Sequence, residues 1–283
     1  MSSQSTTSPS SGSPLAPPPS QSESEFVRPA CERYQLDKDE EVWALVDFLR
    51  RVQAGAPELA ARPQHYNSPL LARFLIGRKW NADKALSSLV SFAEMADRCN
   101  IFSGEIGEQE RDEISRGKME FVRDDDGQGR TVAFMRTERH FPGEYPIEQT
   151  MRLLIFTILH IMDTPRTVRG GLVVVVDMSS AGLANFSIDE RRRLFDLIQH
   201  RLPARIARLY VLDPPWVLSV ILRIISAFLK QKLRDRICRM RRKEILSILP
   251  TTVLPTWLGG AVQMHPEAML EAVIRSAKDL GGL

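Results

Sequence analysis

The first third of the chain carries apolar residues at helical spacing within otherwise polar segments. Acidic residues at 37–41 precede apolar positions three or four apart, which predicts a helix, because acidic side chains favour a helix N-terminus. Ser68 followed by Pro69, and then Asn81, are start signals for two further helices. The sequence therefore predicts a small helical unit over residues 36–102, with Leu45, Leu49, Leu89, Phe92 and Met95 among its inward positions.

The second half of the chain alternates predicted helices with predicted strands. Residues 170–177 read GGLVVVVD, an apolar run without alternation, which is typical of a central strand covered on both faces. A further strand is predicted over residues 205–212, and helices are predicted over 147–163 and 188–202. This order predicts an α/β domain with a mainly parallel sheet over residues 103–283.

A β-hairpin is predicted over residues 121–135, because two short apolar runs flank a polar segment that contains Gly127 and Gly129. Three aspartates at 124–126 superficially resemble a calcium loop. The ligand spacing and the terminal Glu of that motif are missing, so a turn is the better interpretation.

The N-terminal segment differs in composition from the rest of the chain. Residues 1–30 are interpreted as a disordered tail, because they begin with Ser, Thr and Pro and hold few hydrophobic side chains. Such a segment cannot offset its ordering entropy by burial. No secretory signal, no Gly after the first Met and no apolar run of membrane-spanning length are found. We therefore expect a cytoplasmic protein, present at membranes only peripherally.

Residues 216–243 join an apolar segment to a densely basic one. Between 217 and 229, Arg223 carries the only charge, so the predicted helix has no polar face. Protein core, a bound ligand or a membrane surface could cover it. From Lys230 onward, apolar residues at helical spacing predict a second, amphipathic helix with a cationic stripe formed by Lys232, Arg236, Arg239 and Lys243.

The positive charge of the chain is concentrated in this stretch. Residues 223–243 hold nine Lys or Arg and one acidic residue, a local charge of 9 − 1 = +8, whereas the whole chain is +3. A cationic patch beside an apolar helix favours an anionic amphiphile or an anionic membrane as its partner. Nucleic acid fits less well, because no aromatic side chain falls among the basic residues at 230–243. The alternative is a buried core helix followed by a solvated basic helix.

Motifs for catalysis and metal binding are missing from the sequence. The five histidines are scattered, and no GxSxG, HExxH or GxxxxGK[ST] pattern occurs. The three cysteines are far apart and have no metal-ligand spacing, which favours reduced thiols. The sequence predicts a binding protein that is not an enzyme and has no cofactor beyond its cargo.

Four segments in the correct order resemble the CRAL-TRIO lipid-binding family. They are LLARFLIGRKWNADKAL at residues 70–86, VVVD at 174–177, the passage from Pro203 to Trp216, and the closing residues 254–260. The resemblance implies a helical N-terminal unit followed by an α/β lipid-binding domain. It also implies a mobile gate helix, with Trp216, Val217, Ile221, Ile225 and Leu229 as its residues.

The same resemblance implies which residues contact lipid. The family's phosphoinositide-binding positions correspond to Arg78, Lys79, Arg205, Lys232 and Arg236. Two headgroup positions of its founding phosphatidylinositol carrier hold Ala204 and Leu233 here, which favours a basic cleft that meets phosphoinositides at the membrane. The pocket lining is predicted, from helical periodicity and the resemblance together, to be Ile155, Leu159, Val175, Phe186, Val220, Ile224 and Phe228.

The resemblance and the basic stretch together indicate a monomeric lipid-binding and lipid-transfer protein. It would enclose one hydrophobic lipid, a phospholipid such as phosphatidylinositol or an isoprenoid-type lipid, and exchange it at anionic membranes that contain phosphoinositides. No nucleic-acid partner is expected. The alternative is a lipid-responsive scaffold that recruits a protein partner without transferring lipid.

Overall fold

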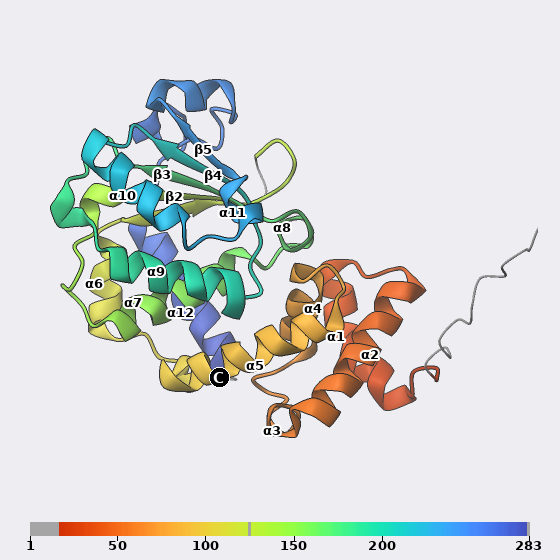
Figure 1. Ribbon diagram of the computed structural model, residues 1–283. Coiled ribbons are helices and arrows are strands. Elements are labelled where there is room, and N and C mark those ends of the chain that lie inside the picture. Colours follow the sequence, from red (N-terminus) through yellow and green to blue (C-terminus); the bar gives the residue numbers. More distant parts are fainter. Residues whose placement is uncertain (1–16, 124–125, 282–283) are drawn as a thin grey trace, which may run out of the picture.

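A group of N-terminal helices precedes a five-stranded sheet with helices packed against it (Figure 1). The computed structural model describes residues 17–123 and 126–281. The three predicted N-terminal helices are present, and two further helices accompany them. In chain order the group is α1 (Gln21–Tyr34), α2 (Asp39–Gly55), α3 (Pro57–Ala60), α4 (Ser68–Gly77) and α5 (Ala82–Arg98).

The predicted tail at residues 1–30 is shorter than expected, because α1 begins within it. Val27, Ala30 and Tyr34 recur at helical spacing and are buried against the other N-terminal helices. Burial of this apolar face offsets the entropy cost of ordering residues 21–30. The first 16 residues of the predicted tail lie outside the described residues.

The central sheet has the strand order β1-β2-β3-β4-β5. The predicted hairpin is confirmed by the antiparallel pairing of β1 with β2, and the other neighbours are parallel. A mainly parallel α/β fold is thereby confirmed. The strands are β1 (Met119–Val122), β2 (Val132–Arg136), β3 (Leu172–Asp177), β4 (Ile206–Leu212) and β5 (Ile237–Met240).

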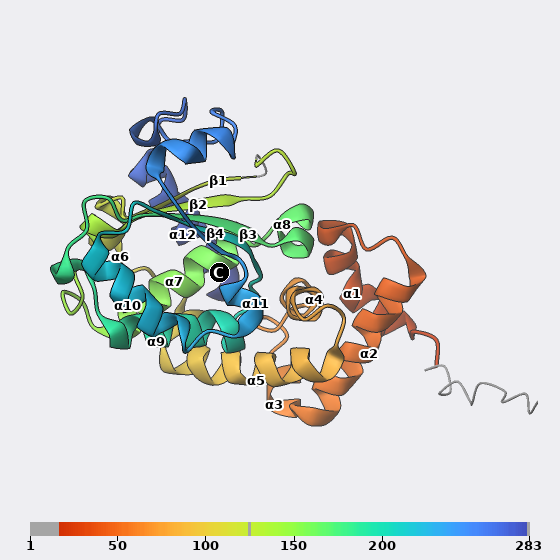
Figure 2. The same ribbon diagram turned by 45° about the horizontal axis from the view of Figure 1, so that its top comes forward.

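Different parts of the chain cover the two faces of the sheet. Helices α7, α9 and α12 lie on one side, and the segment that carries η5 and η6 lies on the other (Figures 1 and 2). The remaining elements are η1 (Ile101–Ser103), α6 (Glu108–Ser115), η2 (Thr137–Arg139), α7 (Ile147–Ile161), α8 (Pro165–Gly170), η3 (Leu183–Asn185), α9 (Ile188–Asp196), η4 (Leu197–Arg201), α10 (Trp216–Ser226), α11 (Gln231–Arg234), η5 (Arg242–Ser247), η6 (Thr256–Leu258) and α12 (Pro266–Gly281).

The predicted basic helix after Lys230 is wrong. Helical turns occur there only in α11 and at the start of the 3-10 helix η5, and residues 237–240 between them form the edge strand β5. Their parallel pairing with β4 places Leu209 beside Ile237 and Leu212 beside Met240. The sequence ICRM fits a strand as well as a helix, and the unpaired backbone groups at the edge of β4 favour the strand. The cationic residues therefore do not form a helical stripe.

A buried polar cluster joins the N-terminal helices to the α/β part. Arg73, in α4, is 7% exposed. Its guanidinium donates hydrogen bonds to the Tyr34 hydroxyl at 2.6 Å and to the Asp163 carboxylate at 2.8 Å. It also donates to the Leu159 carbonyl at 2.5 Å. Because these partners lie in α1, in α7 and just after α7, the cluster fixes the helical group against the domain that carries the sheet.

Candidate functional site

An apolar cavity with about 1270 Å³ of empty space, part of it open to solvent, lies between the sheet and helices α7, α9 and α10. Side chains from strands β3 and β4 and from all three helices line it. Its apolar wall includes Met151, Leu154, Val174, Val176, Leu194 and Leu222. A mostly apolar cavity with a few polar groups is typical of small-molecule sites.

The strand period decides which valines of β3 face the cavity. Side chains alternate along a strand, so Val174 and Val176 line the cavity, whereas Val173 and Val175 pack against the segment on the opposite face. The assignment of Val175 to the pocket is therefore corrected. The sequence VVVV does not show which side chains face the cavity, because every position is apolar.

The side of helix α7 that faces the cavity also differs from the predicted side. Ile155 and Leu159 are 0% and 1% exposed and belong to the main core, away from the cavity wall. Met151 and Leu154 line the cavity in their place. Phe186, which follows η3, lies at the cavity wall.

Helix α10 is apolar on two opposite sides. Leu222 and Ile225 line the cavity, and Leu218 is buried beneath the helix. The outward face carries large apolar side chains that are about half exposed or more, namely Trp216 at 81%, Val220 at 54%, Ile224 at 48% and, just beyond the helix, Phe228 at 46%.

The pocket assignments of Val220, Ile224 and Phe228 are corrected accordingly, since all three face solvent. Among the predicted gate residues, Val217 and Ile221 are partly buried against Leu218, and Leu229 is buried in the main core. The alternative of a helix fully buried in core does not fit, because Trp216, Val220 and Ile224 on its outer face are exposed.

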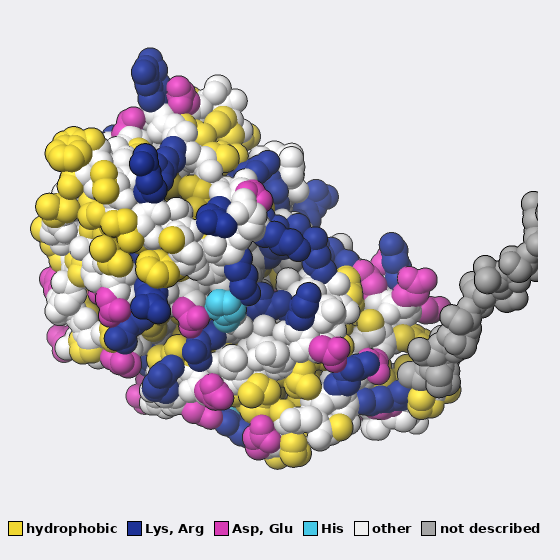
Figure 3. All heavy atoms as spheres, viewed as in Figure 1, with side chains coloured by type: hydrophobic (Ala, Val, Ile, Leu, Met, Phe, Trp, Pro, Cys, Tyr) yellow, Lys and Arg dark blue, Asp and Glu magenta, His cyan; other side chains and the backbone are white. Residues whose placement is uncertain are grey.

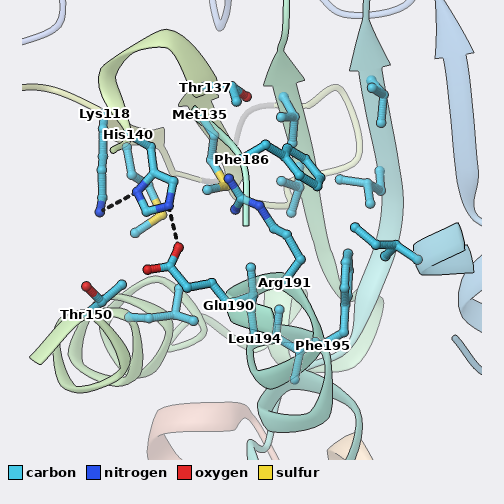
Figure 4. A pocket seen from close by; sticks show the side chains of 18 of the residues that line it. Lys118, Met135, Thr137, His140, Thr150, Phe186, Glu190, Arg191, Leu194 and Phe195 are labelled. Carbon is cyan, nitrogen blue, oxygen red and sulfur yellow. Dashed lines mark hydrogen bonds and ion pairs between the residues drawn. The ribbon is translucent and has the colours of Figure 1, made fainter. Parts of the chain in front are cut away.

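One end of the cavity is polar, which the sequence did not reveal. Lys118 and His140 lie beside Glu190 and Thr150 on one side, while Phe186 and Phe195 lie on the other (Figure 4). The His140 Nε2 atom is 2.8 Å from the Glu190 carboxylate, and Nδ1 is 3.4 Å from the Lys118 ammonium.

Burial controls the protonation of these groups. Desolvation lowers the pKa of Lys118 to about 8, although its ammonium forms an ion pair with Glu113. Desolvation also lowers the pKa of His140, and the hydrogen bond from His140 lowers that of Glu190. Near neutral pH the polar end thus holds a neutral imidazole and an ionised Glu190 carboxylate.

Three of the five predicted headgroup residues come together where α4 meets the start of β4. Arg78 donates to the Leu202 carbonyl at 3.2 Å and to Ser88 at 2.8 Å. Arg205 lies in the loop before β4. Desolvation, and after it the positive charge of Arg205, lowers the pKa of Arg236. Figure 3 shows Lys and Arg side chains gathered in the hollow between the N-terminal helices and the α/β part.

The other two predicted headgroup residues are freely accessible. Lys79 and Lys232 are exposed, and neither forms an ion pair within the described part of the chain. Lys79 adopts a left-handed backbone conformation, with φ of 55°, in the turn after α4. Arg208, which the prediction omitted, is exposed on β4 and adds its charge near Arg236.

Two further features of the described residues bear on the type of site. None of the helices in residues 17–123 and 126–281 is long and apolar enough to cross a membrane. Within the same residues, no group of three or more His, Cys, Asp or Glu is arranged to hold a metal ion.

Comparison with known proteins identifies relatives of this chain. A family model described as the CRAL/TRIO domain matches residues 115–260. Tyrosine-protein phosphatase non-receptor type 9 of Homo sapiens is 28% identical over 226 residues, which cover 80% of this chain and 38% of that protein. Alpha-tocopherol transfer protein-like of Homo sapiens is 26% identical over 246 residues, covering 84% of this chain and 70% of that protein.

Solved structures show the same fold. Sfh5 matches with a TM-score of 0.57 and 12% sequence identity, over 83% of this chain and 96% of that one. The chain spans well under half the length of the phosphatase relatives, 38% in the human protein.

Proposed function

This chain belongs to the CRAL/TRIO domain family, whose members bind hydrophobic lipids, and from that premise we propose that it carries lipid. The carrier encloses one lipid in the cavity and exchanges it at anionic membranes. The transfer activity of this protein, its cargo and its membrane are parts of the proposal.

The two-sided helix α10 is the observation that carries the proposal. Its inner face closes the cavity through Leu222 and Ile225, while Val220 and Ile224 present apolar surface to solvent. A helix that only covered a core would be polar outside. An apolar outer face has a use when the helix enters the lipid interface and uncovers the cavity.

Enclosure is what a lipid carrier must supply. Exposing an acyl chain of about 17 methylenes to water costs on the order of 13 kcal/mol, at ~0.8 kcal/mol per CH₂. The apolar wall beneath α10 removes most of that cost during transit. The lipid can then leave only where another apolar phase receives it.

The cationic cluster supports an anionic membrane as the site of exchange. We propose that Arg78, Arg205 and Arg236, with Lys79 and Lys232, contact phosphate groups of the membrane, as predicted from the family resemblance. Each cation near an anionic surface contributes about 1 kcal/mol to binding.

A vesicle assay tests the proposal. Donor vesicles that contain a fluorescent phospholipid are mixed with acceptor vesicles and catalytic amounts of protein, and lipids extracted from the purified chain are identified by mass spectrometry. We expect transfer that rises with the fraction of phosphoinositide and one lipid per protein chain. Membrane binding without transfer and without an extracted lipid would reject the carrier.

A second candidate is a lipid-responsive module that recruits a partner without moving lipid. The phosphatase relatives favour this candidate, since the matched region there is part of a much longer protein. The same assay separates the two, because such a module would bind vesicles and leave the fluorescent lipid in the donors.

A further inference from the structure

Arg191 brings a positive charge into the cavity that the proposed function has not used. The residue lies in the first turns of α9, and its side chain extends from the helix into the cavity between Phe186 and the polar end (Figure 4). Its Nε atom is shielded from solvent and has no hydrogen-bond partner among the described residues. No ion pair of Arg191 occurs in that part of the chain either.

The neighbouring acidic groups are engaged elsewhere. The Glu190 carboxylate accepts a hydrogen bond from His140 at 2.8 Å, and Glu113 forms an ion pair with Lys118. The guanidinium of Arg191 instead lies over the Phe186 ring, 5.3 Å from its centroid. Arg191 is partly buried, and although the Glu190 charge lies near it, no carboxylate forms a hydrogen bond with its guanidinium among the described residues. A ligand that supplies the missing acceptor would offset the cost of desolvating this cation.

We propose that the cavity selects an amphiphile with an oxyanion head, a carboxylate or a phosphate, which pairs with Arg191. The inference rests on the proposed carrier function and names the class of its cargo. The planar guanidinium fork matches the two oxygens of either group. The tail of the amphiphile lies along the apolar side formed by Phe195, Val174 and Leu222.

Selectivity follows from the same geometry. A neutral lipid of equal length fills the apolar side but leaves the guanidinium without an acceptor. Sites built around a buried polar group discriminate strongly against analogues that lack its partner. An acid should therefore bind more tightly than its own ester, although the ester is the more hydrophobic molecule.

Fluorescence binding of a polyene fatty acid, cis-parinaric acid, and of its methyl ester to the full chain tests this inference. The wild-type protein should bind the acid at least tenfold more tightly than the ester. Arg191→Met should lower the affinity for the acid at least tenfold and leave that for the ester unchanged. Arg193→Gln is the matched control, since Arg193 lies on the same helix, is exposed and pairs with Asp189. It should alter neither affinity.

Competition with phospholipids identifies the source of the oxyanion. Displacement of the acid by phosphatidic acid would assign a phosphate head. Phosphatidylcholine of the same chains, whose phosphate is a diester next to a choline cation, then shows whether a phosphate monoester is required. Failure of both to displace it would assign a carboxylate head. Equal affinity of the wild-type protein for acid and ester would overturn the inference and leave the carrier standing, even if Arg191→Met did not fold. Binding of neither probe would refute the carrier itself.

Discussion

At the scale of single residues, buried charges determine how the parts of this molecule are joined. Arg73 has three partners from separate segments, and its side chain is almost fully buried. The Asp163 carboxylate that it contacts is partly exposed. Removing one member of a buried charged pair is much more damaging than removing a surface pair, because the other member stays behind without a partner.

We expect Arg73→Leu to lower the free energy of unfolding by about 3 kcal/mol, because it removes the buried guanidinium that donates to the Tyr34 hydroxyl, the Leu159 carbonyl and the Asp163 carboxylate. Urea denaturation measures the change. The control Arg51→Leu breaks exposed pairs with Asp47 and Asp83 and should cost no more than about 1 kcal/mol. Equal losses in the two variants would show that the buried cluster does not join the two parts.

His160, which is partly buried, makes stability depend on pH. Desolvation, with the nearby charge of Arg123, lowers its pKa from 6.5 to about 4. Between these pH values His160 is protonated in the unfolded chain and neutral in the folded chain. The stabilising contribution is therefore fully present above pH 6.5, declines as the pH falls toward 4, and is constant below it.

His160→Gln should flatten this dependence, because glutamine does not titrate. Chemical denaturation of both proteins at pH 7 and pH 5 provides the measurement. The wild type should lose more stability between the two pH values than the variant does. Parallel losses in the two proteins would assign the dependence to other groups.

At the scale of elements, helix α10 concentrates the proposed function. The variant Val220→Ser with Ile224→Ser should leave stability within about 0.5 kcal/mol, because both side chains are exposed. It should lower the rate of lipid transfer at least tenfold, since about 2 kcal/mol of apolar burial in the membrane interface is lost.

The matched control changes Leu246 and Ile248 to Ser. These residues are exposed to a similar degree, 42% and 41%, but lie in and just after η5, away from the cavity. Transfer should then continue at the wild-type rate. An equal decrease in both double variants would mean that general surface hydrophobicity, and not α10, sets the rate.

Most helices and strands could be predicted from the sequence, but the side that each turns toward the cavity could not. Helical spacing located α2, α5 and α7, and turn residues located the hairpin, because these signals are local. The strand β5 was missed, since its pairing with β4 depends on a neighbour in space. The cavity-facing side of α10 was assigned wrongly because both of its sides are apolar, and the polar end was missed because its members lie up to 77 positions apart, from Glu113 to Glu190.

At the scale of the whole molecule, folding gathers charges that the sequence keeps apart. Arg78 follows α4, Arg205 precedes β4 and Arg236 precedes β5, yet all three lie near the junction of the helical group and the α/β part. The resemblance to the family indicated these positions, whereas spacing alone would have placed the cationic residues on a helix that does not form.

Charge reversal of Lys232 and Arg208 to Glu should weaken binding to vesicles that contain phosphoinositide by about 1 kcal/mol per residue, and less at high salt. Both side chains are exposed, so the fold should be unaffected. Sedimentation with vesicles measures the effect. Lys278→Glu, at an exposed cation of α12, is the control, and an equal loss there would indicate attraction by net charge alone.

The segment between β4 and β5 is anchored at both of its ends. Asp213 donates its backbone N–H to the Met240 carbonyl at 3.0 Å, and its carboxylate accepts from the Arg242 backbone N–H at 3.1 Å. The Arg236 carbonyl accepts from Leu209 at 2.9 Å. We propose that the residues between these two anchors move outward when the cavity opens, while β4 and β5 stay paired. On this proposal lipid exchange does not require the sheet to unfold, so variants that stabilise the sheet should resist unfolding longer and transfer lipid at the wild-type rate.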